Sequence, residues 1–270
     1  MPLSSARLAS LLTPRGGVRL ARGLAYGPHP RHRLDLYTPP GATEAAPLLL
    51  FVHGGAWVGG TRTEYGFVAT PLARAGALVA AMDYRLWPEA GFPAFVEDTA
   101  RAARWLAAAH PARRLVLMGH SAGAFNAAAA ALDPRWGARE AVGGFIGVSG
   151  PYDFTPEEVT PPAIFAGLAR VEAVPPEVPL AGAPPLLLLH GAQDTTVGPY
   201  HSERLAARAR EAGVPVRHVT WPGLSHIDIM AGFTPAARFL RMGEPAVLAE
   251  ALAFLGLAPA STPAAPPPRA

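Results

Sequence analysis

Five residues, Gly119 to Gly123, place a serine between a short apolar run and a long alanine-rich stretch. The run Leu115–Met118 is typical of a buried strand, and the residues from Ala122 onward favour a helix. A sharp strand-to-helix turn forces Ser121 into a strained backbone conformation, because only small neighbours can pack around it. Such a turn exposes the serine hydroxyl at the carboxyl edge of a sheet and aims the Ala122 amide at whatever binds above it. The sequence therefore predicts a serine nucleophile.

No other serine fits this pattern. Ser149 and Ser225 each follow a glycine by two residues, but a proline and an isoleucine stand where the second glycine would have to be. A tight strand–helix turn without chemistry is the alternative interpretation. We favour the nucleophile because further polar residues follow other predicted strands, where a site of this kind would need them.

The composition excludes several kinds of protein and of chemistry. The chain has 270 residues, 50% hydrophobic and 16% charged, which suits one large α/β domain with a sizeable core. No apolar run in the sequence approaches the roughly 18–20 residues that a membrane span needs. All 23 basic residues are arginine and there is no cysteine, so Schiff-base, Ser–Lys and thiolate mechanisms are excluded.

The net charge and the N-terminal residues indicate which binding partners and which cellular location to expect. The formal net charge is +3, but the arginines are scattered among alanines and acids without interleaved aromatic residues. We therefore expect no nucleic-acid partner. The apolar patch Leu8–Leu12 is too short for a secretory signal, so we expect a cytoplasmic protein. The sequence leaves a homodimer open.

Apolar runs and amphipathic stretches alternate from about Leu48 to Leu255, which is typical of parallel strands connected by helices. Before them, Val18–Tyr26 and His32–Tyr37 predict two antiparallel strands, and a short helix precedes these. We therefore expect an α/β fold with a mostly parallel central sheet, helices on both faces and antiparallel N-terminal strands. The core strands are expected at Leu48–Val52, Leu78–Met82, Leu115–Met118, Val142–Val148, Leu186–Leu189 and Val216–Thr220, and the helices at Tyr65–Gly76, Pro93–His110, Ala122–Leu132, Tyr200–Ala212 and Glu244–Leu255.

Two proline-rich segments depart from this alternation. Residues 150–184 hold eight prolines and only a short helical patch near Ala163–Val171. A loop this long within a domain is usually functional, so we expect a short cover over the site. Residues 258–270, with the run Pro266–Pro268, predict a disordered tail. The expected division is one domain over residues 1–257 and a tail over residues 258–270.

The first core strand is followed by a loop with the sequence His53-Gly54-Gly55-Ala56-Trp57. In a parallel sheet ligands bind at the carboxyl ends of the strands, and two glycines let backbone amides turn toward such a ligand. Amides fixed in this way stabilise an oxyanion by about 3–4 kcal/mol each. An ordinary glycine loop is the alternative, and we expect His53 to brace the loop. The expected oxyanion hole consists of the amides of Gly54, Gly55 and Ala122, with Ala56 as a further candidate.

The acid and the base follow later strands. Asp194 comes after Leu186–Leu189, where its carboxylate can hold a histidine ring in the required tautomer and stabilise the imidazolium. Asp153, after the preceding strand, is the rival acid. His226 lies in a loop after the last strand, and the order Ser121, Asp194, His226 along the chain is the order expected with this kind of turn. Such a site requires neither a cofactor nor a metal, and we expect none.

The predicted strand Leu78–Met82 is followed directly by residues Asp83–Glu89. Phe92-Pro93-Ala94 and the adjacent acids Glu97 and Asp98 come next. We expect Arg85 to pair with one of these two acids and so to fix the loop beside the site. This role is structural and does not by itself indicate an activity.

Taken together, these motifs resemble those of the α/β-hydrolase superfamily. The chain is most similar to the H-G-G-x-W carboxylesterases, which include hormone-sensitive-lipase-like, kynurenine-formamidase-like and feruloyl-esterase-like hydrolases. Ala56 replaces the third glycine of the lipase-like loop, and residues 150–184 are too few for the large helical cap of that branch. The resemblance spans roughly residues 30–256 and implies an α/β-hydrolase fold. The matching residues are His53–Trp57, Asp83–Glu89 with Phe92-Pro93-Ala94 and Glu97-Asp98, Gly119–Gly123, His190-Gly191 with Asp194, and Pro222-Gly223 with His226.

The resemblance and the motifs imply a serine carboxylesterase that hydrolyses small or medium acyl or aryl esters through an acyl-enzyme. The expected partner is a small-molecule ester. Two alternatives stay open: an arylformamidase or amidase that acts on an N-formyl or related amide, and a catalytically inactive binding protein of the same fold. The expected substrate-binding residues are Trp57, Trp87, His120 and Tyr152, with Tyr65 and Phe154 as further pocket candidates, although aromatic residues are also common in cores.

Overall fold

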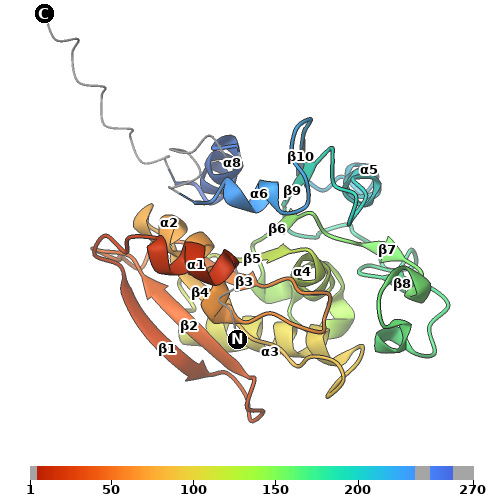
Figure 1. Ribbon diagram of the computed structural model, residues 1–270, viewed down its shortest axis with the longest axis horizontal. Helices are drawn as coiled ribbons and strands as arrows, with labels where there is room; N and C mark the ends of the chain where they lie inside the picture. The colour runs from red at the N-terminus through yellow and green to blue at the C-terminus, as the bar shows by residue number, and fades with distance from the viewer. Residues whose placement is uncertain (1–4, 235–243, 258–270) are drawn as a thin grey trace, which may run out of the picture.

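The computed structural model describes residues 5–234 and 244–257 of the chain. Within them, eight strands form one sheet in the order β1-β2-β4-β3-β5-β6-β9-β10 (Figure 1). β2 pairs antiparallel with β1 and β4, whereas all other neighbours in this sheet are parallel. The expected sheet is thus confirmed. Its strands are β1 (Arg19–Ala25), β2 (Arg33–Thr38), β3 (Leu48–Val52), β4 (Leu78–Met82), β5 (Leu115–His120), β6 (Gly144–Val148), β9 (Leu186–Gly191) and β10 (Val216–Trp221).

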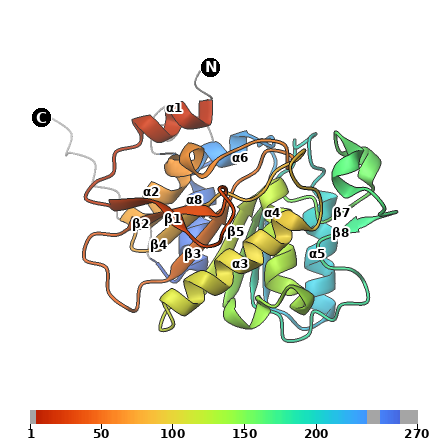
Figure 2. The same ribbon diagram turned by 90° about the horizontal axis from the view of Figure 1, so that it is seen from below.

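Helices cover both faces of the sheet, as expected (Figure 2). α3, α4 and α5 pack on one face, α2 and α8 pack on the other, and α1 lies against α2. The predicted helix after the first core strand starts with the 3-10 turn η1 (Arg62–Tyr65), and the sequence patterns do not predict α6. The α-helices are α1 (Ser5–Leu12), α2 (Gly66–Arg74), α3 (Ala94–Ala109), α4 (Ala122–Leu132), α5 (Tyr200–Glu211), α6 (Asp228–Ala231) and α8 (Ala246–Phe254).

Side chains along the core strands alternate between the two faces. Leu48, Leu50 and Val52 of β3 join the apolar cluster beneath α3, α4 and α5. Leu49 and Phe51 join the cluster beneath α2 and α8. All five side chains are fully buried, which explains why a parallel strand of this kind is a continuous apolar run in the sequence. The carboxyl ends of β3, β5, β9 and β10 therefore meet at one edge of the sheet.

The proline-rich segment 150–184 differs in detail from the expectation. The prediction of a helical patch near Ala163–Val171 is wrong. The 3-10 turn η5 (Pro162–Phe165) is followed by the short strand β8 (Val171–Glu172), which pairs with β7 (Asp153–Phe154). Gly167 has a φ of 84°, which a right-handed helix cannot contain, so a helix cannot continue to Val171. Ile164 and Phe165 are buried in the main core, so the segment is packed onto the domain. The tail predicted at residues 258–270 lies outside the described residues.

A buried carboxylate fixes the chain that follows β4. Asp98 of α3 is fully buried and accepts hydrogen bonds from the Arg85 guanidinium at 2.7 and 3.0 Å, from the Arg85 backbone amide at 2.8 Å, and from His32 Nε2 at 2.8 Å. Arg85 also pairs with Glu97, at 3.1 Å, but the Glu97 side chain is half exposed. The expected pairing of Arg85 is confirmed with both acids. Asp98 thereby joins α3 to the residues before β2 and after β4.

We expect Asp98→Asn to lower the free energy of unfolding by about 3 kcal/mol, because it removes a buried carboxylate charge that is paired with Arg85 and that accepts a hydrogen bond from His32. The matched control is Glu97→Gln, which removes a carboxylate from the same arginine at an exposed position and should cost less than about 1 kcal/mol. Urea unfolding followed by circular dichroism measures both values. Equal losses for the two variants would contradict this account.

Candidate active site

Ser121 lies on the sharp turn between β5 and α4 that the sequence predicts. Its φ of 53° and ψ of −127° place a non-glycine residue in a strained region of the backbone map. A Cβ added to Gly119 would lie 2.2 Å from the Gly123 carbonyl oxygen, and a Cβ added to Gly123 would lie 2.1 Å from the Val52 carbonyl oxygen. Both positions therefore require glycine. The Ser121 amide donates to the Val148 carbonyl at 3.0 Å, which ties the turn to the end of β6.

Three loops bring Ser121, His226 and Asp194 together. The Ser121 hydroxyl donates to His226 Nε2 at 2.9 Å, and His226 Nδ1 donates to Asp194 Oδ2 at 2.7 Å. Ser121 precedes α4, Asp194 follows β9, and His226 follows β10, so all three lie where parallel strands end. An alcohol, an imidazole and a carboxylate in this chain of hydrogen bonds form the geometry of a nucleophile, a base and an orienting acid.

Asp194 is held on both carboxylate oxygens. Oδ1 accepts from the backbone amides of Thr196 at 3.0 Å and Val197 at 2.8 Å, while Oδ2 accepts from His226 and lies 3.3 Å from His190 Nε2. Burial alone would raise the pKa of Asp194, but the hydrogen bonds from His190, His226 and Val197 outweigh it and hold the pKa well below its usual range. The carboxylate therefore stays ionised and can stabilise a positive charge on His226.

His120, next to the serine, supports the His226 loop. Its Nε2 donates to the His226 carbonyl at 3.2 Å, and the two rings lie 4.9 Å apart. Burial, reinforced by the nearby His226, lowers the pKa of His120 to about 3, so this ring is neutral at ordinary pH. The hydroxyl of Ser225 donates to Asp228 at 2.5 Å on the other side of His226, in the first turn of α6. The sequence indicates His120 as a pocket residue but gives no sign of this bracing contact.

A second serine–histidine pair lies behind Asp194. The Ser202 hydroxyl donates to His190 Nδ1 at 2.7 Å, and His190 Nε2 donates to the Val197 carbonyl at 2.9 Å. Ser202 and His190 are both fully buried, whereas Ser121 is partly exposed. A substrate carbonyl can reach only the exposed serine, so the inner pair is suited to hold Asp194 in place rather than to attack. The sequence places His190 at a buried strand end, but nothing in it links His190 to Ser202.

The glycine loop after β3 lies against Ser121. A Cβ added to Gly54 would lie 3.1 Å from both Ser121 Cβ and the His120 carbonyl oxygen. His53 is fully buried, and its Nδ1 donates to the Gly54 carbonyl at 2.7 Å, while burial lowers the pKa of His53 to about 4. The neutral ring thus braces the loop, as expected. Tyr84 supports the same turn by donating to the His53 carbonyl at 2.9 Å.

The amides of this loop are not equivalent. Burial raises the pKa of Tyr65 to about 12, and a hydrogen bond from the Gly54 backbone opposes part of this rise. Gly54 itself is buried. Gly55 and Ala56 are exposed, with φ values of 117° and 49°. In the described part of the chain, the amides of Gly55, Ala56 and Ala122 donate no hydrogen bond.

The aromatic side chains expected to bind substrate mostly lie in the core. Trp57 is 2% exposed, donates from its indole nitrogen to Asn126 at 2.9 Å, and packs against Phe154 and Phe165. Tyr152 is also buried, and its ring lies where a side chain on Gly147 or Gly150 would clash. Trp87 is half-buried against the same core. Substrate contacts at these residues stay predictions; in this structure Trp57 and Tyr152 lie in the core and Trp87 packs against it.

The rival acid lies away from the histidine. Asp153, on β7, forms ion pairs with Arg170 and, at 3.4 Å, with Arg204. Its side chain is 25% exposed and makes no contact with His226 among the interactions of the described residues. Asp194 is therefore the acid that the structure brings to His226.

Other features of the described residues limit what the chain can bind. No cluster of three or more histidine, aspartate or glutamate side chains suited to a metal ion occurs among residues 5–234 and 244–257. No helix in those residues is long and apolar enough to cross a membrane.

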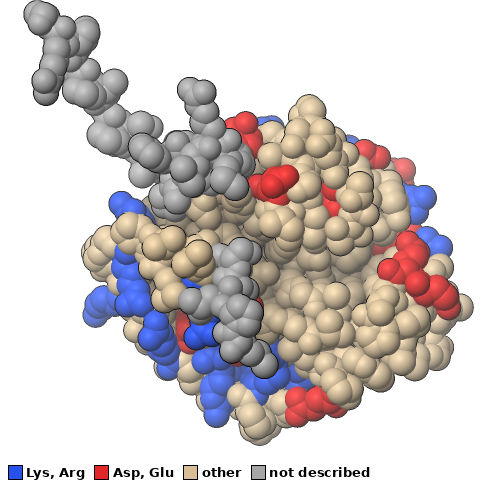
Figure 3. All heavy atoms as spheres, in the orientation of Figure 1, with Lys and Arg blue, Asp and Glu red and all other residues tan. Residues whose placement is uncertain are grey.

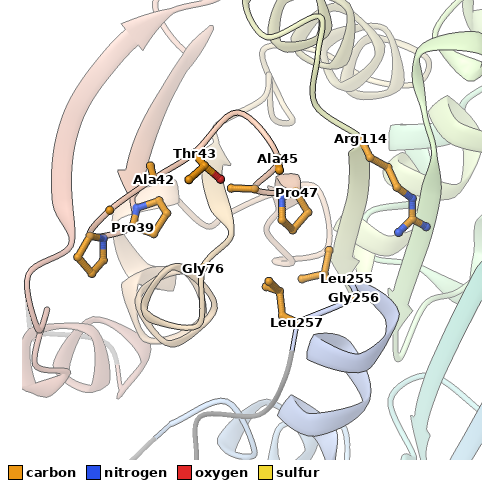
Figure 4. Close-up of a pocket in the computed structure, with 13 residues that line it drawn as sticks. Pro39, Ala42, Thr43, Ala45, Pro47, Gly76, Arg114, Leu255, Gly256 and Leu257 are labelled. Atoms are coloured by element: carbon orange, nitrogen blue, oxygen red, sulfur yellow. The ribbon is translucent and has the colours of Figure 1, made fainter.

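A hollow of about 400 Å³ lies at the amino ends of β3, β4 and β5, beside Pro47, Gly76 and Arg114 (Figure 4). Because Ser121 follows the carboxyl end of β5, this hollow is separate from the candidate site.

Two family models match the chain. One is described as the Prolyl oligopeptidase family and matches residues 93–242, a range that includes Ser121, Asp194 and His226. The other is described as BD-FAE and matches residues 34–140, which include the glycine loop and the serine turn.

Two curated relatives carry different activities in their names. The chain is 28% identical over 246 residues to a probable isoprenylcysteine alpha-carbonyl methylesterase of Oryza sativa subsp. japonica, and the match covers 78% of this chain and 59% of that protein. It is 34% identical over 152 residues to a kynurenine formamidase of Salmo salar, covering 52% of this chain and 51% of that protein. The chain thus spans less than two thirds of the length of these relatives.

A solved structure extends the likeness to the whole fold. An esterase from the bacterial hormone-sensitive lipase family superposes with a TM-score of 0.72 at 26% sequence identity, over 94% of this chain and 92% of the other. The Prolyl oligopeptidase model, for its part, covers more than half of the chain. The chain therefore belongs to the prolyl oligopeptidase family and has the α/β-hydrolase fold that it shares with esterases of the hormone-sensitive lipase group.

Proposed function

We propose that this protein is a serine carboxylesterase that hydrolyses small or medium acyl or aryl esters through an acyl-enzyme. The observation that carries the proposal is the position of His226, which contacts Ser121 Oγ at 2.9 Å and Asp194 Oδ2 at 2.7 Å. No cofactor takes part in this reaction.

In the first step, His226 Nε2 takes the proton from the Ser121 hydroxyl as the oxygen attacks the ester carbonyl. A tetrahedral intermediate forms, and the positive charge on His226 is stabilised by Asp194, whose hydrogen bonds keep it ionised. His226 then returns the proton to the leaving alcohol, and the acyl group stays on Ser121.

The oxyanion of the intermediate accepts hydrogen bonds from the amides of Gly55, Ala56 and Ala122. The absence of other hydrogen-bond partners for these amides supports this set, and the exposure of Gly55 and Ala56 favours them over Gly54, which is buried. The Ala122 amide lies at the N-terminus of α4, where the helix dipole adds to the stabilisation of a negative charge. Each such donor is worth about a hundredfold or more in turnover.

In the second step, water takes the place of the alcohol. His226 removes a proton from the water, the hydroxide attacks the acyl carbonyl, and Ser121 leaves with the proton from His226. The carboxylic acid is released and the free enzyme is restored.

Two exposed apolar side chains flank the reacting groups in sequence. Val58 follows the glycine loop and is 45% exposed, and Ile227 follows His226 and is 66% exposed. We assign these residues to the apolar rim that receives the acyl or alcohol group. They carry no motif, which is why the sequence does not single them out.

Amide hydrolysis on the same site is the second candidate function. The likeness to a kynurenine formamidase favours it, and the triad geometry suits both reactions. The name of the plant relative, a methylesterase, supports the ester. An inactive binding protein fits the contacts of His226 less well. A cytoplasmic location and a homodimer are proposals that rest on the sequence alone.

We expect Ser121→Ala to lower kcat for p-nitrophenyl acetate by at least about a thousandfold, because among the described residues no other hydroxyl contacts His226 Nε2. The matched control is Ser202→Ala, which removes the buried serine of the inner pair and should keep kcat within about tenfold of wild type. Steady-state kinetics on the two purified variants measure the difference. An active Ser121→Ala enzyme together with an inactive Ser202→Ala enzyme would transfer the nucleophile to the inner pair.

Asp194→Asn should lower kcat by about four orders of magnitude, because the amide allows the wrong imidazole tautomer and cannot stabilise its positive charge. KM should change little. Asp153→Asn is the control and should leave kcat within about threefold, because Asp153 faces arginines rather than His226. The acid role would pass to Asp153 if the two variants behaved the other way round.

Substrate choice separates the ester and amide candidates. We expect kcat/KM for p-nitrophenyl acetate or a feruloyl ester to exceed that for N-formylkynurenine by at least about tenfold, since an amide has the poorer leaving group. Parallel kinetics on the three compounds give the ratio. A higher efficiency on N-formylkynurenine would establish the amidase alternative, and Ser121→Ala should abolish whichever activity is found.

A further inference from the structure

The N-terminal part of the chain is basic in sequence and forms one face in space. Arg7, Arg15, Arg19 and Arg22 all precede the first acidic residue, Asp35. Figure 3 shows arginine side chains gathered over the face that carries β1 and β2. The scattered arginines of the sequence are thus brought together by the fold.

This positive charge is not neutralised locally. Arg15, Arg19 and Arg22 are exposed and form no ion pair with the described residues. Asp35, the acid nearest to them along the chain, is buried and already holds Arg62 at 2.8 Å. The face therefore keeps a net positive potential that an anionic partner can use.

A hollow of about 490 Å³ lies among these arginines. Arg7 and Leu11 of α1, Arg15 of the following loop, and Arg22 of β1 reach it together, and Tyr37 forms part of its wall. Burial raises the pKa of Tyr37 to about 12, and the nearby Arg22 and Arg15 oppose part of this rise. Arginine guanidinium groups therefore lie at the rim of the hollow. One guanidinium group can donate two parallel hydrogen bonds to the oxygens of a phosphate.

Apolar side chains stand exposed on the helix beside this hollow. Leu8, Leu11 and Leu12 of α1 are 49%, 68% and 68% exposed. The opposite side of α1 is anchored, since Ala6 and Ala9 pack on the core and the Ser10 hydroxyl donates to the Glu64 carbonyl at 2.6 Å. The helix thus presents leucines outward with arginines around them.

We propose that α1 and the β1–β2 hairpin dock on the surface of an anionic phospholipid membrane. The leucines of α1 enter the boundary between headgroups and acyl chains, and Arg15, Arg19 and Arg22 bind lipid phosphates. A headgroup phosphate occupies the hollow between α1 and β1. The binding is peripheral and adds a location to the proposed esterase without depending on its activity.

The exposed leucines favour a lipid over a nucleic acid as the polyanion. Proteins bind single-stranded nucleic acids through basic side chains together with exposed aromatic rings that stack on the bases. The exposed apolar side chains of α1 are aliphatic instead. A soluble phosphate ester could enter the hollow but would leave the three leucines in water. An anionic bilayer satisfies the charge and the apolar surface at once.

The docking face also adjoins the candidate active site. Ser10 of α1 donates to the Glu64 carbonyl and accepts from the Phe67 amide at 3.1 Å, which places α1 on η1. The last residue of η1 is Tyr65, whose ring stacks on the His53 ring at 6.2 Å, and His53 is the first residue of the glycine loop beside Ser121. α1 is therefore connected to the glycine loop through η1, an arrangement suited to esters that partition into the bilayer.

Vesicle sedimentation tests the proposal with the full chain. The wild-type protein should pellet with vesicles of phosphatidylcholine and phosphatidylglycerol in equal parts, stay in solution with phosphatidylcholine alone, and be released by high salt. The double variant Arg22→Gln/Leu11→Ser should bind the anionic vesicles at least about thirtyfold more weakly, since it removes one charge and one apolar anchor. The matched control, Arg210→Gln/Leu168→Ser, makes the same changes at exposed positions elsewhere and should bind like wild type.

Other results would overturn the proposal. Unchanged binding in the first variant, or equal losses in both variants, would remove α1 and β1 from the interface. Binding to single-stranded RNA with no binding to vesicles would establish a nucleic-acid face instead. Thermal stabilisation by glycerol 3-phosphate without vesicle binding would identify a soluble phosphate ligand. Unchanged melting temperature and p-nitrophenyl acetate hydrolysis in both variants exclude misfolding as the cause of a loss.

Discussion

The hydrogen bond from His226 Nδ1 to Asp194 Oδ2, 2.7 Å long, is the contact on which the proposed chemistry depends. It decides which imidazole nitrogen faces Ser121, and it gives the positive charge that develops on the ring a fixed partner. The bond is possible only because β9 and β10 are adjacent parallel strands, so that the loops after them leave the sheet at the same edge. The sheet order and the chemistry are therefore linked through a single contact.

The surroundings of this bond explain its stability. Two backbone amides and the His190–Ser202 pair hold Asp194 from behind, and His120 holds the carbonyl of His226 from the side. All of these contacts except the one from the Thr196 amide are buried, and hydrogen bonds hold the pKa of Asp194 well below its usual range, so the carboxylate keeps its charge. Ser121 is positioned from the opposite side by a strained turn that only glycine at 119 and 123 allows.

Much of this arrangement is local enough to be predicted from the sequence. The strands Leu48–Val52 and Leu78–Met82 are predicted to the residue because a strand buried on both faces has to be apolar throughout. The serine turn, the acid and the base follow from glycine spacing and from their order along the chain. What the sequence does not predict depends on contacts between distant residues. These are the stacking of Tyr65 on His53, the inner pair behind Asp194, the β7–β8 ladder, and the gathering of arginines around α1. No local pattern encodes these contacts.

The most direct test of the central claim is to locate the covalent adduct of a phosphorylating ester inhibitor such as paraoxon. Trypsin separates the two serines of interest, because residues 115–135 contain only Ser121 and residues 171–204 contain only Ser202. Mass spectrometry of the digested protein should find the diethyl phosphoryl group on the peptide 115–135, at Ser121. An adduct on the peptide 171–204, or no adduct on either peptide, would contradict the account.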